Sequence, residues 1–106
     1  MKSNPQIYRQ GDVLILRVSA IPKDAKPANR DVGNIVLAYG EVTGHSHAIA
    51  DTKAKGFIFG DALYLDLERK CDISHQEHGT VTLEPGKYQV VHQHEYRRKE
   101  IVRTDD

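Results

Sequence analysis

The sequence of 106 residues has little cysteine, no long apolar run and no excess charge of either sign. Its one cysteine, Cys71, excludes an internal disulfide and a zinc site built on cysteine pairs, and we expect it to be a buried or half-buried small apolar residue. No window approaches the roughly 18 uninterrupted apolar residues that span a membrane. The first ten residues, MKSNPQIYRQ, lack the apolar core of a secretory signal. We therefore predict a cytoplasmic protein that does not enter a membrane.

The charges are balanced, since Lys+Arg and Asp+Glu each number 15. A strongly basic domain would indicate nucleic-acid binding, whereas this chain leaves room for a local basic patch at most. Its 39% apolar and 28% charged residues are ordinary for a soluble globular protein. The chain is too short for two separate cores, so residues 1–106 are predicted to form one domain.

Apolar residues recur in short runs, mostly with a period of two, which indicates strands rather than helices. We expect strands at 12–18, 35–39, 45–50, 56–59, 62–67, 80–83 and 88–91, with a weaker one at 69–75. Residues 22–33 contain two prolines and a closing glycine and are predicted to be a mobile loop, and residues 97–106 a charged tail. The predicted fold is all-β, a small single-domain β-barrel or sandwich of about seven to nine strands that hides its sheet edges.

The segment Glu84–Lys87 carries a Pro-Gly pair, which favours a type II turn between the last two strands. The cross-strand pairs that such a hairpin predicts are Leu83 with Tyr88, Val81 with Val90 and Gly79 with His92. In this register His78 and His92 point to opposite faces of the hairpin. Only one of the two would then join a given site, unless the strand bends at Gly79.

The histidines occur in three close pairs, and none lies outside a pair. They are His45 and His47, His75 and His78, and His92 and His94. Residues two apart on a strand point to the same side, roughly 6–7 Å apart, so two such imidazoles can bind one metal ion. We expect a site built from His45 and His47 with one or both of His75 and His78, and with His92 as the next candidate. The predicted metal ligands are His45, His47, His75, His78 and His92, with Asp51, His94 and Glu95 as alternatives.

Three classes of function are compatible with these histidines. The first is a divalent-metal site for catalysis or for binding a small-molecule ligand or substrate. The second is metal-independent acid–base cleavage of RNA, because histidine titrates near neutral pH and the basic run at 97–103 could contact phosphate. The third is a non-catalytic interaction or regulatory domain. The candidate catalytic residues are His45, His47, Glu77 and His78. An exposed edge strand also makes a homodimer a reasonable expectation.

Two segments resemble the motifs of the cupin superfamily, whose members are small β-barrels. The first motif contains a glycine, a His-x-His pair and an acidic residue, and the second contains a glycine, a Pro-Gly-type turn and another histidine. The matching residues are Gly40, His45, His47 and Asp51 in the first motif, and Gly79, Pro85, Gly86 and His92 in the second. The resemblance implies a cupin-like fold in which His45, His47 and His92 bind a divalent Zn, Fe, Mn or Ni ion. It places Asp51 in the position of the fourth ligand.

A second resemblance covers nearly the whole chain. The ordered pattern YRQGDV, GEVTGHxH, HxEHG, LxPGxYxV and QxEY is similar to a set of small uncharacterised bacterial proteins. This resemblance implies no particular function.

Overall fold

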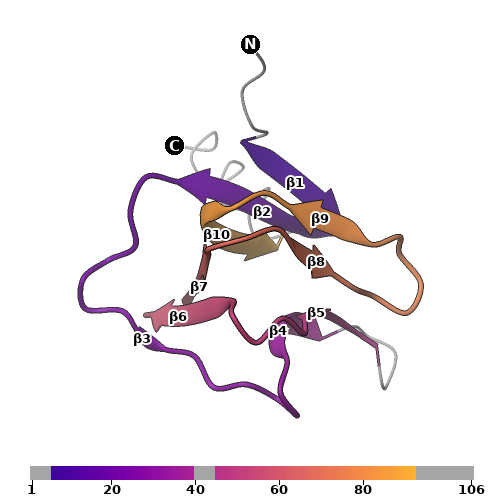
Figure 1. Ribbon diagram of the computed structural model, residues 1–106, viewed down its shortest axis with the longest axis horizontal. Helices are drawn as coiled ribbons and strands as arrows, with labels where there is room; N and C mark the ends of the chain where they lie inside the picture. Colours follow the sequence, from indigo (N-terminus) through magenta and orange to yellow (C-terminus); the bar gives the residue numbers. More distant parts are fainter. Residues whose placement is uncertain (1–5, 40–44, 93–106) are drawn as a thin grey trace, which may run out of the picture.

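The computed structural model describes residues 6–39 and 45–92, and these residues form an all-β domain (Figure 1). Its strands are β1 (Ile7–Gln10), β2 (Val13–Val18), β3 (Lys26–Pro27), β4 (Ile35–Tyr39), β5 (Ser46–Ile49), β6 (Lys55–Phe59), β7 (Ala62–Leu67), β8 (Cys71–Ile73), β9 (Val81–Leu83) and β10 (Gly86–His92). The described ranges include no helix with the length and apolar character needed to cross a membrane. The predicted all-β class is therefore confirmed.

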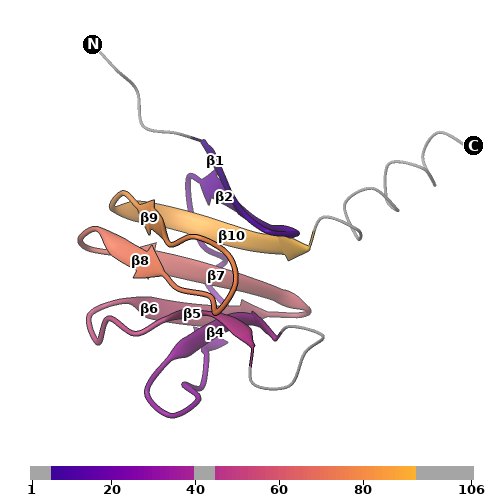
Figure 2. The same ribbon diagram turned by 90° about the vertical axis from the view of Figure 1, so that its right-hand side faces the viewer.

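Six of the strands form one antiparallel sheet in the order β1-β2-β10-β7-β6-β3. The other four form two antiparallel pairs, β4 with β5 and β8 with β9. Two backbone hydrogen bonds between Ala48 and Ser74, of 3.1 and 2.9 Å, connect β5 to the end of β8. Figure 1 shows β8 and β9 in front of β10 and β7, and Figure 2 shows the same layers turned by 90°. The sheets are not closed into a barrel, so the domain is sandwich-like.

The core lies between these layers and follows the predicted period of two. In the large sheet, alternate residues of the central strands belong to the core cluster, as a covered sheet face requires. They are Val13 and Ile15 in β2, Leu65 and Leu67 in β7, and Tyr88 and Val90 in β10. The second layer contributes Ile35, Ile49, Ile73 and Leu83. The buried hydroxyl of Tyr88 donates to the Glu84 carbonyl at 2.6 Å and accepts from Nη2 of Arg17 at 2.8 Å, so its polar end is satisfied.

The predicted pairing of the last two strands is wrong, because β9 and β10 lie in different sheets. Leu83 and Val81 pair with residues of β8, and both edges of β10 are occupied by β2 and β7. The chain passes from one layer to the other at Glu84–Pro85. Gly86 then begins β10 with a φ of 151°, far from the value of about +80° that a type II turn requires at this position. The Pro-Gly pair thus marks a change of sheet rather than a hairpin.

Two further segments differ from the sequence-based expectation. Strand β1 was not predicted, because it is only four residues long and mixes exposed, half-buried and buried residues. The segment predicted as a mobile loop, residues 22–33, contains β3, which pairs with Phe57 and Ile58 of β6. The charged tail at 97–106 lies outside the described residues.

Cys71 is buried in the core, as its residue type predicts, with 3% of its surface exposed. Burial, together with the nearby charge of Asp51, raises the pKa of its thiol to about 11. Because the thiolate is the reactive form, we expect the folded protein to react slowly with a thiol reagent such as DTNB and the unfolded protein to react quickly. Absorbance at equal reagent concentration, with and without urea, measures this difference. Rapid stoichiometric labelling of the folded chain would contradict the buried position.

Candidate functional site

Four of the predicted histidines meet in one hollow of about 400 Å³, at a place where three connecting segments converge. The turn between β1 and β2 contributes Gly11 and Asp12. The beginning of β5 contributes His45 and His47. The connection from β8 to β9 contributes His75, Glu77 and His78. The complete lining is Gly11, Asp12, His45, His47, His75, Glu77 and His78. Residues more than 60 positions apart in sequence therefore form one surface.

The four imidazole rings are close neighbours. Ring centres lie 4.3 Å apart for His47 and His75 and 4.7 Å apart for His75 and His78. The corresponding distances are 5.7 Å from His45 to His75 and 5.8 Å from His47 to His78. Imidazoles bound to one tetrahedral ion have ring centres roughly 5 Å apart, given metal–nitrogen bonds of about 2.0–2.1 Å. The four distances, from 4.3 to 5.8 Å, lie on either side of this value.

The orientation of the rings is not yet that of a metal complex. Nδ1 of His75 accepts hydrogen bonds from the backbone N–H groups of Glu77, at 3.0 Å, and His78, at 3.3 Å. Its lone pair is therefore directed at its own connection rather than into the hollow. Among the described residues, no three His, Cys, Asp or Glu side chains are placed to hold a metal ion as they stand. For His75 to bind a metal ion in this hollow, its ring must turn.

His47 is held by a buried partner that the sequence-based reasoning missed. Its side chain is on β5, where it is 4% exposed, and its Nδ1 lies 2.8 Å from Oε1 of Gln10, which is 2% exposed. Gln10 ends β1 and is the one buried residue of that strand. Gln10 belongs to the sequence pattern YRQGDV, but a single polar residue next to a glycine carries no signal of burial.

The surroundings of the cluster keep two of its imidazoles neutral. The pKa of His47 is lowered to about 4, mainly by burial. The charges of His75, His78 and His92 also lower this pKa, whereas the negative charge of Asp12 raises it. Burial also lowers the pKa of His75, with His78 and His45 adding to the effect. At neutral pH both rings are therefore uncharged, which is the form that binds metal ions.

His45 is anchored at the edge of the hollow by contacts with the connection between β8 and β9. Its Nδ1 lies 3.8 Å from Oε1 of Glu77, whose side chain is 65% exposed. The neighbouring backbone N–H of Ser46 donates to Oε1 of Gln76 at 2.9 Å. These contacts bring the two histidine pairs together.

His78 lies against the turn between β1 and β2. A Cβ atom at Gly11 would lie 2.6 Å from Nε2 of His78, so the imidazole ring would have to shift. Gly11 also has a φ of +61°, which side chains other than glycine rarely adopt. The turn therefore favours glycine at this position, and a side chain here would displace the imidazole of His78.

The other predicted ligands lie elsewhere. The carboxylate of Asp51 accepts from Arg69 at 2.9 and 3.0 Å and from the Lys53 backbone N–H at 2.7 Å, and these contacts lower its pKa to about 2. It is not part of the lining of the hollow. His92, at the end of β10, is near enough to influence His47 electrostatically but does not line the hollow either. His94, Glu95 and the basic run at 97–103 lie outside the described residues.

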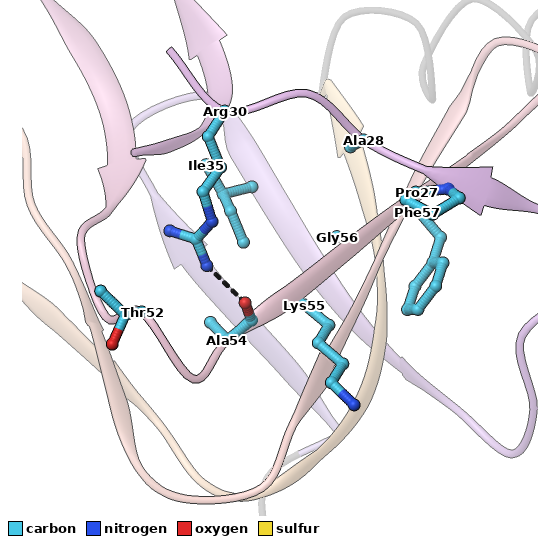
Figure 3. A pocket seen from close by; sticks show the side chains of 9 residues that line it. All are labelled: Pro27, Ala28, Arg30, Ile35, Thr52, Ala54, Lys55, Gly56 and Phe57. Carbon is cyan, nitrogen blue, oxygen red and sulfur yellow. Dashed lines mark hydrogen bonds between the residues drawn. The ribbon is translucent and has the colours of Figure 1, made fainter. Parts of the chain in front are cut away.

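A second hollow of about 250 Å³ lies between β6 and the segment that contains β3, and Figure 3 shows its lining side chains. The guanidinium of Arg30 points into it and donates to the Ala54 carbonyl, which the dashed line marks. The same group donates to the Gly33 carbonyl at 2.8 Å and to the Asp51 carbonyl at 3.0 Å. Arg30 therefore satisfies three backbone carbonyls in two segments, a structural role, and we place the candidate site at the histidines.

Comparison with known proteins gives one match. A family model described as a domain of unknown function, DUF8820, matches residues 9–93, which include Gln10 and the complete lining of the histidine hollow. No curated protein and no solved structure matches the chain. Because the family model covers well over half of the 106 residues, the chain belongs to the DUF8820 family.

Proposed function

We propose that this protein binds a divalent transition-metal ion in the histidine hollow and uses it for catalysis or for binding a small molecule. The proposed ligands are the imidazoles of His45, His47, His75 and His78. The observation that carries the proposal is the convergence of four imidazoles from two distant segments at the spacing of a shared ion. Chance surface histidines have no reason to converge in this way.

The chemistry of the cluster supports a metal over a free acid–base pair. A neutral imidazole binds an ion without first losing a proton, and the low pKa of His47 supplies that form down to mildly acidic pH. Imidazole suits zinc, iron and nickel, and manganese when a carboxylate contributes. Two carboxylate side chains line the hollow, Asp12 and Glu77, and Glu77 lies 3.8 Å from His45. A tetrahedral ion held by three of these imidazoles keeps its fourth position for water or substrate.

Two other versions of the site receive less support. The cupin-like ligand set needs Asp51, whose carboxylate is engaged by Arg69. Metal-free RNA cleavage needs a protonated imidazole as general acid near neutral pH, and the lowered pKa of His47 excludes this candidate from that role. The cytoplasmic location and the homodimer remain predictions. A purely regulatory role also remains a prediction, and no feature of the described residues favours it over the metal site.

The proposal is tested by metal binding to the untagged protein, purified without chelator and titrated with Zn, Ni, Mn or Fe(II) under calorimetric detection. We expect about one ion per chain for at least one of these metals. The double variant His45→Ala/His78→Ala changes no fully buried residue and should lose this binding while keeping the thermal unfolding transition. Asp51→Asn is the matched control, and it should bind as the wild type does.

Two results would contradict the proposal. One is the absence of stoichiometric binding for all four metals. The other is binding that survives in the double variant, which would place the ion elsewhere. Loss of binding in Asp51→Asn alone would instead favour the cupin-like ligand set.

A further inference from the structure

We infer that Gln10 is a positioning residue that selects the tautomer of His47 and thereby leaves its Nε2 free to bind the metal ion. The metal part of this inference rests on the proposed function. The tautomer part rests on hydrogen bonds alone and can be tested in the metal-free protein.

The side-chain amide of Gln10 can have only one orientation. Its Nε2 lies 2.8 Å from the Ile73 carbonyl oxygen and 2.9 Å from the Gly79 carbonyl oxygen. Carbonyl oxygens accept hydrogen bonds and never donate them, so the NH₂ group must face both. The carbonyl oxygen Oε1 of Gln10 therefore faces the opposite way, toward His47.

This orientation decides where the proton of His47 resides. Oε1 of Gln10 is only an acceptor, and it lies 2.8 Å from Nδ1 of His47. Nδ1 must therefore carry the hydrogen and donate it. In the neutral ring the other nitrogen, Nε2, then has no proton and keeps its lone pair. Metal-binding histidines are commonly oriented by such a hydrogen bond to the nitrogen that does not bind the metal.

Gln10 also holds the segment that carries the second histidine pair. Ile73 ends β8 and Gly79 lies just before β9, so the amide contacts both ends of the connection that contains His75 and His78. One side chain from β1 thus links His47 to the base of this connection.

The test compares the wild type with Gln10→Leu, which has a similar size but neither accepts nor donates a hydrogen bond. Tyr8→Phe is the matched control, because it removes a hydrogen-bonding group from the same strand, where Tyr8 accepts from the Glu84 N–H, without touching His47. Long-range ¹H–¹⁵N spectra of the imidazoles, recorded without metal, report which nitrogen is protonated. Calorimetry with zinc reports the affinity.

We expect the wild type and Tyr8→Phe to show His47 protonated at Nδ1 alone. Gln10→Leu should show both tautomers and bind zinc about 10- to 100-fold more weakly, the usual loss when the group that orients a ligand is removed. A wild-type spectrum with the proton on Nε2 overturns the inference, and this measurement does not depend on whether Gln10→Leu folds. An unchanged tautomer or an unchanged affinity in a folded Gln10→Leu overturns it as well.

A failure of the proposed function gives a different pattern. If the wild type binds no metal, the metal site is rejected, yet the spectra of the wild type and Gln10→Leu still support or overturn tautomer selection by Gln10.

Discussion

Replacing Gly11 by alanine is expected to lower the free energy of unfolding by about 1–2 kcal/mol and to weaken the proposed metal binding by roughly tenfold or more. The stability loss follows from the φ of +61°, which a residue with a side chain adopts at a cost. The loss of affinity follows from the added Cβ, which would lie 2.6 Å from Nε2 of His78 and must displace that ring. Urea unfolding and calorimetric titration measure the two effects.

Gly60 offers a control that separates these causes. It has nearly the same φ, +60°, but a Cβ built on it meets no atom within 4 Å. Gly60→Ala should therefore show the loss of stability without the loss of affinity. Equal metal affinities in Gly11→Ala and Gly60→Ala would mean that the position of His78 is irrelevant to the site.

Acidification from pH 7 to pH 4 is expected to destabilise the wild type by up to about 3 kcal/mol more than the variant His47→Asn. The pKa of His47 is about 4 in the folded chain and near 6.5 when unfolded, so the unfolded state takes up the proton first as the pH falls. Folding stability is thus intact above the unfolded pKa and declines between about pH 6.5 and pH 4.

Asparagine at position 47 removes the titrating group but can still donate a hydrogen bond to Oε1 of Gln10. Urea unfolding of both proteins in metal-free buffer, at several pH values between 7.5 and 4, gives the difference directly. Other titrating groups contribute to both curves, so only their divergence is attributed to His47. Parallel curves would show that His47 does not carry the pH dependence.

The local sequence pattern predicts the individual strands of this fold better than it predicts which strands pair with each other. The apolar run in 12–18 correctly indicates β2. The alternation of leucines in 62–67 correctly indicates β7 and the face it buries, because the period of two is a property of a single strand. The short strand β1 escapes prediction, since four residues with one buried glutamine show no such period. Turn chemistry misleads at Pro85–Gly86, where the chain changes sheet.

For the candidate site, too, the local pattern predicts some features and misses others. The pairing of histidines along the chain predicts a cluster, and the choice of His45 and His47 with His75 and His78 agrees with the side chains that line the hollow. The predicted conflict between His78 and His92 came from a hairpin that does not form. Strand β9 pairs with β8 instead, and this pairing carries His78 to the beginning of β5.

What the chain sequence specifies here is periodicity, residue chemistry and the spacing of histidines, all of which act over a few neighbouring residues. The partner of His47 depends on contacts across 37 positions, and those of Gln10 with Ile73 and Gly79 span 63 and 69 positions. Such contacts arise only when the layers pack, because burial removes water and forces each polar group to find a partner within the protein. A glutamine that no local pattern distinguishes thereby becomes the residue that orients the histidine site.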